Sequence, residues 1–264
     1  MPTDTWDPQQ YHRFQAERRA PFEDLLALVR PITGGPAVDL GCGTGELTRA
    51  VLDATGAASV VGIDNSAAML TEAEAFAGGG VSFREGDIGT FPGSTDGTFD
   101  LVIANAALQW VPDHRAVLRR WTRALAPGGQ LAVQVPANAD HASHRLSAQV
   151  AAGEPFLSAF GPAGPPPDPV LDVLVPEAYA ELLDELGYVE QHVRLQVYGH
   201  RLASTADVVE WVKGTSLTRF KKRLAPDVFA SFVDAYRDAL LAELGDRAPY
   251  FYAFKRVLLW GRRA

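Results

Sequence analysis

Apolar residues in the first half of the chain follow two alternating patterns. Short runs dominated by apolar residues predict buried strands at residues 38–40, 58–64, 81–85, 99–104 and 130–136. Stretches with apolar residues at helical spacing predict helices at residues 21–29, 46–54, 66–77 and 113–125. Strands that alternate with helices in this way favour a parallel sheet covered on both faces. We therefore expect an α/β fold, doubly wound and Rossmann-like.

The second half of the chain departs from this alternation. Helical segments are expected within residues 137–160 and at 176–186, and they are separated by a loop rich in proline and glycine at 161–169. A strand at 188–197 and a last strand at 252–260 flank a helical insertion, in which Ser204 is expected to cap one helix and Pro226 to begin another. The two late strands bring the predicted sheet to seven strands. We expect one domain over 1–264, with helical cap elements at 137–180 and 200–250.

Composition and charge narrow the classes of function. Apolar residues make up 47% of the chain, which is enough for a large core, and the net charge of 24 − 32 = −8 disfavours nucleic acid or an anionic membrane as a partner. Basic residues nevertheless cluster around Lys213–Arg223 and at the C-terminus. The single cysteine, Cys42, and the lack of a long apolar run fit a cytoplasmic protein. A small molecule is therefore the expected substrate, with no metal site and a monomer or weak homo-oligomer.

The stretch Val38–Leu47 reads as a strand that turns on alternating glycines into a helix. Glycine at Gly41, Gly43 and Gly45 allows a tight turn and a close approach of backbone to ligand. The dinucleotide fingerprint would carry its third glycine where this chain has Glu46, and a carboxylate there disfavours a bound pyrophosphate. The loop therefore predicts a cofactor other than NAD.

Two acids at later strand ends suit an adenosine group. Asp64 lies 64 − 45 = 19 residues beyond the last loop glycine, where a carboxylate can accept hydrogen bonds from both ribose hydroxyls. Asp87 can accept from the adenine amino group while Ile88 covers the ring face, although a surface turn would also explain Asp87. Met69 suits either the adenine edge or the core.

The glycine loop, with Asp39 at its acidic position, resembles motif I of the class I S-adenosylmethionine-dependent methyltransferases. This resemblance implies S-adenosylmethionine as cofactor, S-adenosylhomocysteine as product, an antiparallel last strand and an N-terminal lid over residues 1–30. It also implies that Asn105 lies nearest the reacting centre. The expected cofactor-binding residues are Tyr11, Asp39, Gly41, Cys42, Gly43, Gly45, Asp64, Asn65, Met69, Asp87, Ile88, Asn105, Ala106 and Trp110.

Within that family the chain is most similar to the trans-aconitate methyltransferases. The similarity covers the stretches 11–18, 38–45, 62–70, 87–88, 104–114, 131–136, 198–200 and 211–212. The chain departs from the family pattern at Thr218-Arg219, where an Arg-Pro pair is expected. The resemblance implies a carboxylate oxygen of a small organic acid as the methyl acceptor.

Esterification of a carboxylate fits the residues present, because a group with a pKa of roughly 4 is already ionised at neutral pH and needs no general base. The expected catalytic residues are Asn105 and His200, and the expected acceptor-binding residues are Gln109, Tyr198, His200, Arg219 and Arg256. His114, Tyr198 and His200 keep open an alternative acceptor, another small molecule or a lipid, with an oxygen, nitrogen or carbon centre that requires a base. An NAD-linked oxidoreductase and a non-catalytic binder of an adenosyl ligand remain as further alternatives.

Overall fold

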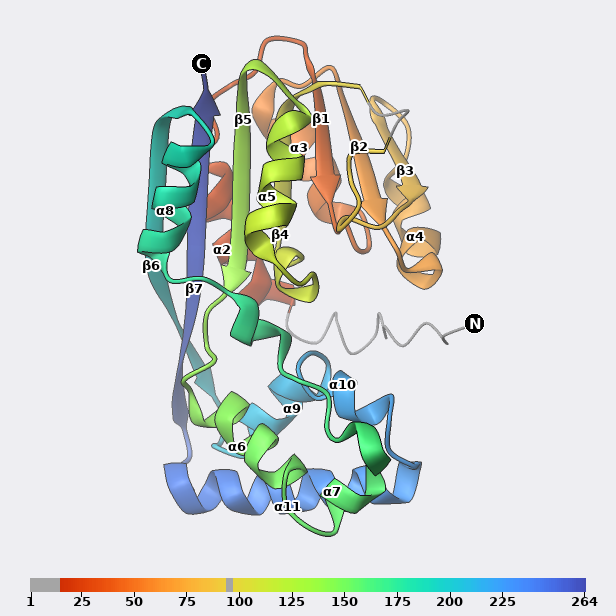
Figure 1. The fold of residues 1–264 in the computed structure, drawn as a ribbon, viewed down its shortest axis with the longest axis vertical. Coiled ribbons are helices and arrows are strands. Elements are labelled where there is room, and N and C mark those ends of the chain that lie inside the picture. Colours follow the sequence, from red (N-terminus) through yellow and green to blue (C-terminus); the bar gives the residue numbers. More distant parts are fainter. Residues whose placement is uncertain (1–14, 94–96) are drawn as a thin grey trace.

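The computed structural model describes residues 15–93 and 97–264, and its centre is one seven-stranded sheet (Figure 1). The strand order is β3-β2-β1-β4-β5-β7-β6. The first five strands are parallel, and β7 runs antiparallel to both β5 and β6. The strands are β1 Pro36–Leu40, β2 Ser59–Asp64, β3 Val81–Glu85, β4 Phe99–Asn105, β5 Leu125–Pro136, β6 Tyr188–Leu202 and β7 Tyr250–Arg263.

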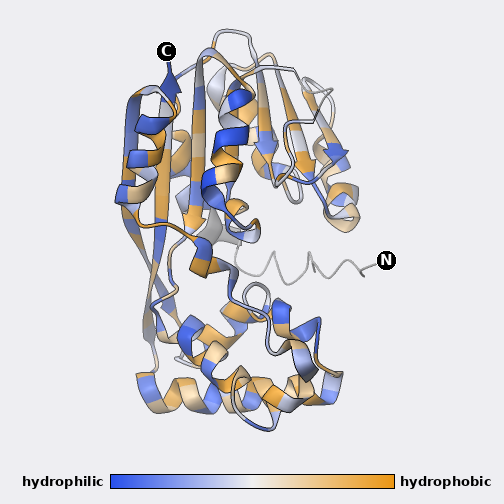
Figure 2. Ribbon diagram, viewed as in Figure 1, coloured by the Kyte–Doolittle hydropathy of each residue, from blue (hydrophilic) through white to orange (hydrophobic). Residues whose placement is uncertain are grey.

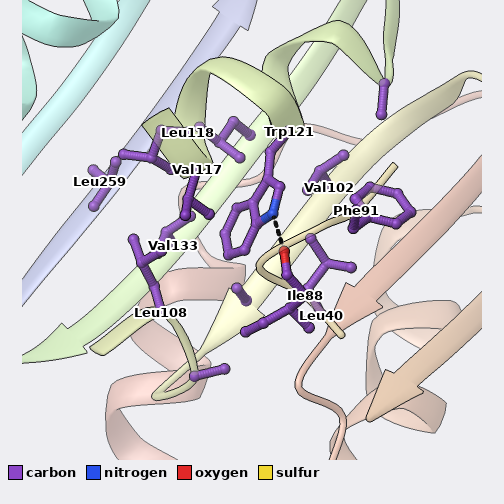
Figure 3. Packing of buried hydrophobic residues seen from close by; sticks show 14 of the residues in the cluster. Leu40, Ile88, Phe91, Val102, Leu108, Val117, Leu118, Trp121, Val133 and Leu259 are labelled. Atoms are coloured by element: carbon purple, nitrogen blue, oxygen red, sulfur yellow. Dashed lines mark hydrogen bonds between the residues drawn. The ribbon is translucent and has the colours of Figure 1, made fainter. Parts of the chain in front are cut away.

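Helices cover both faces of the sheet. One face carries α2 (Gln15–Leu26) and α3 (Glu46–Thr55), whose Phe22, Leu25 and Val51 pack against Leu101 and Leu258. The other face carries α5 (His114–Arg123) and α8 (Pro176–Glu185), and its apolar core surrounds the fully buried Trp121 (Figure 3). The remaining short helices beside the sheet are α4 Ala67–Ala73, η1 Glu74–Phe76 and η2 Leu108–Trp110.

A second group of helices lies beyond the carboxyl ends of the parallel strands, where β6 and β7 extend past the rest of the sheet (Figure 1). We call this group the cap. It has its own apolar cluster, built around Phe220, Phe232, Tyr236 and Tyr252. The strands in the centre of the sheet are mostly hydrophobic, whereas β6 at its edge and the helices of both parts carry many hydrophilic residues (Figure 2). The cap contains α6 Ala142–Ala151, α7 Phe156–Ala159, η3 Gly161–Ala163, α9 Asp207–Lys213, α10 Thr218–Lys221 and α11 Pro226–Leu244, and η4 Pro169–Asp172 connects it to α8.

The predicted fold class, the seven strands and the antiparallel last strand are confirmed. Several boundaries differ. The strand expected at 130–136 already begins at Leu125, because Phe99 of β4 pairs with Leu125 before a register shift. Ser204 does not cap a helix: α9 begins at Asp207, and the Ser204 backbone N–H and hydroxyl both donate to the Asp207 carboxylate, at 2.8 and 3.0 Å. No helix in the described ranges is long and apolar enough to cross a membrane.

Candidate active site

The glycine loop follows β1 and has a left-handed backbone at each predicted glycine, with φ of 78° at Gly41, 54° at Gly43 and 80° at Gly45. A Cβ on Gly41 would lie 2.3 Å from the Cβ of Ala107, and one on Gly45 would lie 2.6 Å from the Phe83 ring. A Cβ on Gly43 would meet no atom within 4 Å. Gly41 and Gly45 therefore permit close packing, while the backbone of Gly43 is open toward a ligand.

Asp64, the last residue of β2, has its carboxylate fixed by two backbone groups. The Gly43 N–H donates to Oδ2 and the Ser66 N–H donates to Oδ1, each at 2.9 Å. Each carboxylate oxygen can accept more than one hydrogen bond. The fixed carboxylate can therefore still accept the hydroxyls of a ribose.

A cavity of about 630 Å³ lies at the carboxyl ends of the parallel strands, which is the usual place for a ligand in a sheet of this topology. Its volume is typical of a small-molecule site. The cavity wall consists of Gly41, Gly43, Asp64, Asn65, Met69, Gly86, Asp87, Ile88, Gly89, Thr90, Asn105, Ala106, Ala107, Trp110, Val111, Pro112, Arg120, Thr218 and Lys222.

Most of the residues expected to bind the cofactor lie in this wall. They are Gly41, Gly43, Asp64, Asn65, Met69, Asp87, Ile88, Asn105, Ala106 and Trp110. The Asp87 carboxylate accepts from the Gly89 N–H at 2.7 Å, as in the surface turn that the sequence also allowed, and still faces the cavity. The Ile88 carbonyl accepts from the Trp121 indole N–H at 2.9 Å, which attaches this turn to the core (Figure 3).

Three of the expected cofactor residues lie behind the wall instead, and one cannot be placed. Asp39 is buried and accepts a hydrogen bond from the Thr48 hydroxyl at 2.6 Å. Burial raises the pKa of Asp39 to about 6, against the effect of the Thr48 hydrogen bond and helped by the charge of Asp64. Burial also raises the pKa of the Cys42 thiol, which makes it a poor nucleophile. Gly45 packs against Phe83, and Tyr11 lies outside the described residues.

Among the five expected acceptor-binding residues, all of which the structure describes, none lines the cavity. Gln109 is buried, and its Nε2 donates to the Ala106 carbonyl at 2.6 Å. The Tyr198 hydroxyl donates to the Asp24 carboxylate of α2 at 2.7 Å. The His200 ring packs against Trp211, with ring centroids 4.7 Å apart.

The two expected acceptor arginines are both buried, at 8% exposure for Arg219 and 5% for Arg256. Nη1 of Arg219 lies 2.6 Å from Oδ2 of Asp168, and both side chains belong to the cap region. Arg256 lies on β7, with its guanidinium carbon 4.9 Å from the centre of the Phe254 ring. Arg219 is thus directed at Asp168 within the cap region. Arg256 pairs in register with Pro136 at the end of β5.

The cavity wall also contains residues that the sequence did not predict as part of the site. Thr218 and Lys222 reach it from α10 and the residue that follows, and Arg120 reaches it from α5. Lys222 belongs to the basic cluster noted in the sequence, but the spacing of that cluster does not tell which member faces the site. The cap therefore contributes to the wall through Thr218 and Lys222 rather than through Arg219.

Comparisons with known proteins agree with this geometry. Residues 37–129 match the methyltransferase domain family. The chain is 46% identical to a trans-aconitate 2-methyltransferase of Deinococcus radiodurans, covering 98% of each chain, and 38% identical to one of Methylobacterium radiotolerans with the same coverage. The YcgJ protein of Bacillus subtilis has the same fold, with a TM-score of 0.60 at 13% identity over 93% of this chain and 98% of that one.

The structure provides its own test of the cofactor. Three features fit the adenosine of S-adenosylmethionine. They are the open space beside the Gly43 backbone, the Asp64 carboxylate fixed at the end of β2, and the adjoining cavity. The protein is a methyltransferase that uses this cofactor, and its acceptor is a small molecule. The chain belongs to the trans-aconitate 2-methyltransferase family.

Proposed function

We propose that the enzyme methylates a carboxylate oxygen of trans-aconitate or of a closely related tricarboxylic acid. The observation that carries the proposal is the 46% identity, over 98% of both chains, to a relative named for that reaction. The chemistry of the cavity wall supports it.

The cavity offers little general-base chemistry. The titratable groups in its described wall are Asp64, Asp87, Arg120 and Lys222. Both acids are assigned to the cofactor, Asp64 to the ribose and Asp87 to the adenine, and the two basic side chains are hydrogen-bond donors. An acceptor that must lose a proton would find no evident base in this wall, whereas a carboxylate with a pKa of roughly 4 is already ionised.

The positions of the residues support the following roles. S-adenosylmethionine supplies an electrophilic methyl group on a sulfonium when it is bound. Asp64 would hold the ribose, and Asn105 at the end of β4 would orient the acceptor carboxylate toward the methyl group. Transfer would replace the C–S bond with an O–C bond to the acceptor, and S-adenosylhomocysteine would leave. No proton moves, because the two opposite charges neutralise one another.

The three candidate bases, His114, Tyr198 and His200, lie outside the described cavity wall. Nδ1 of His114 lies 2.6 Å from the Tyr179 hydroxyl, and burial lowers the pKa of this histidine. Tyr198 is bonded to Asp24, and burial together with that carboxylate raises the pKa of its phenol. His200, the second expected catalytic residue, packs against Trp211 and stays a prediction.

A panel of acceptors tests the proposal. The purified enzyme is incubated with S-adenosylmethionine and with mono-, di- and tricarboxylic acids, phenols and amines, and mass spectrometry detects the gain of one methyl group. We expect trans-aconitate to give a methyl ester that alkali hydrolyses. Transfer to a phenol or an amine, with no ester formed from any acid, would overturn the proposal.

A further inference from the structure

Gln134 of β5 is a fully buried polar side chain that the fold leaves without hydrogen bonds. Its exposure is 0%, and in the described structure neither Oε1 nor Nε2 has a partner. Buried amides are almost always paired, because water no longer solvates them. An unpaired amide at this depth therefore calls for an explanation beyond the folding of the chain.

Gln130 shows that the same strand can pair such a group. It lies four residues earlier on the same face of β5 and is 4% exposed. Its Oε1 accepts from the Arg30 backbone N–H at 2.8 Å and from the Trp260 indole at 2.9 Å, and its Nε2 donates to the Arg30 carbonyl at 2.9 Å. Both polar atoms of Gln130 therefore have partners, whereas neither polar atom of Gln134 has one in the described structure.

The position of Gln134 connects it to the reacting centre. It pairs in register with Asn105 of β4, so the two side chains project from the same face of neighbouring strands about 4.8 Å apart. Asn105 lines the cavity, and its Oδ1 is likewise buried without a partner in the described residues. On the other side, Arg256 of β7 pairs with Pro136, one pleat beyond Gln134 on that same face. Asn105, Gln134 and Arg256 therefore form a polar row across three strands, continuous with the cavity through Asn105.

We propose that Gln134 and Arg256 bind a second carboxylate of the acceptor, one that is not methylated, and thereby select polycarboxylic acids. This inference rests on the proposed function and identifies the residues that bind the part of the acceptor that is not methylated. Nε2 of Gln134 donates a hydrogen bond to the carboxylate, and the guanidinium of Arg256 supplies the opposite charge. Asn105 holds the reacting carboxylate at the other end of the row.

The test compares Gln134→Leu with Gln130→Leu. Because Gln134→Leu removes an unpaired amide, we expect an unchanged or higher melting temperature, together with a KM for trans-aconitate raised at least tenfold. Its KM for a monocarboxylic acid and its affinity for S-adenosylmethionine should not change. Gln130→Leu breaks three hydrogen bonds, so it should lower the melting temperature and leave the KM of the folded enzyme alone. Gln134→Met, which keeps the length of the side chain, serves as a second variant.

A binding measurement separates this inference from the proposed function. Trans-aconitate is titrated calorimetrically into the wild type and Gln134→Leu in the presence of S-adenosylhomocysteine, so that no transfer is needed. Binding by the wild type that the variant loses at least tenfold supports the inference even if no ester forms. Ester formation with a wild-type KM in both Gln134 variants overturns it while the proposed function stands. A lower melting temperature of both Gln134 variants, without a change in KM, would show that Gln134 has a purely structural role and would also overturn the inference.

Discussion

The backbone N–H of Gly43 donates to the carboxylate of Asp64 across 2.9 Å, so the loop after β1 and the acid at the end of β2 fix one another. This contact lies within the protein and does not depend on a bound cofactor. Because Ser66 holds the other carboxylate oxygen, Asp64 faces the cavity in a defined orientation before any ligand arrives. Such preorganisation removes an ordering cost from cofactor binding.

Replacement of Asp64 should weaken the binding of the cofactor. We expect Asp64→Ala to reduce the affinity for S-adenosylmethionine by roughly 1–3 kcal/mol, because charge-assisted hydrogen bonds to the ribose are lost. Isothermal calorimetry measures the effect, and Asp53→Ala, at an exposed position on α3, is the matched control. NADH should bind neither protein. A preference for NADH over S-adenosylmethionine would contradict the assignment of the site.

Asp39 should make the ligand-free enzyme less stable as pH rises. Its pKa is about 6 in the folded protein, above the usual value near 4 that the unfolded chain keeps. Between these values the folded state holds a proton that the unfolded state has lost. The free energy of unfolding therefore falls as pH rises from about 4 to about 6 and stays lower above that, by on the order of 3 kcal/mol.

Asp39→Asn should remove this pH dependence. We expect the variant to gain stability over the wild type at pH 7.5 and little at pH 4, as measured by urea unfolding at both values. Because Asp39 lies beneath the glycine loop, the same variant should bind the cationic cofactor more weakly. An equal stability difference at both pH values would show that the buried carboxylate does not titrate in this window.

The sequence predicts the sheet side of this site well, because each strand and helix there follows from a local pattern of residues. Alternating strands and helices are sufficient for the parallel sheet, and the carboxyl ends of its strands then bring Gly43, Asp64 and Asn105 together. The contribution of the cap depends instead on how distant helices dock. Lys222 is one basic residue among several until α10 is placed beside the cavity.

The sequence does not predict which buried polar side chains are paired, because their partners lie far away along the chain. Gln130 and Gln134 look alike in an apolar strand, and only Arg30 and Trp260 distinguish the paired amide from the unpaired one. The charge of Arg219 and its position in the helical insertion after Trp211 indicated an acceptor role. Its ion-pair partner Asp168 belongs to a proline-rich loop 219 − 168 = 51 residues earlier, and no periodic pattern connects the two.

Lys222 should attract an anionic acceptor into the cavity. We expect Lys222→Glu to raise the KM for trans-aconitate several-fold at low ionic strength, with a smaller effect at high salt because the charge is solvent-exposed. Lys221→Glu is the matched control, since it makes the same charge change one residue away at an exposed position outside the cavity wall. Identical KM values for the two variants at every salt concentration would remove Lys222 from the acceptor path.

Arg219 should act mainly on the stability of the cap. Its guanidinium and the Asp168 carboxylate form a buried ion pair, and Nδ1 of His144 lies 2.9 Å from the same carboxylate oxygen. Burial alone would raise the pKa of Asp168, but the hydrogen bond from His144 and the charges of His144 and Arg219 outweigh it and lower that pKa. The stabilisation is therefore present above the unfolded pKa near 4 and is lost as pH falls through the lower, folded value.

Removal of one partner from this pair should cost more than removal of both. We expect Arg219→Met to lower the free energy of unfolding by roughly 3–5 kcal/mol at pH 7, because it leaves the Asp168 carboxylate buried without its cation. Arg219→Met combined with Asp168→Leu should recover much of that loss, since neither charge is then buried alone. Urea unfolding measures both variants, and kinetics at a temperature where each stays folded give the acceptor KM. A raised KM in Arg219→Met with wild-type stability would instead restore Arg219 to the acceptor-binding role that the sequence predicts.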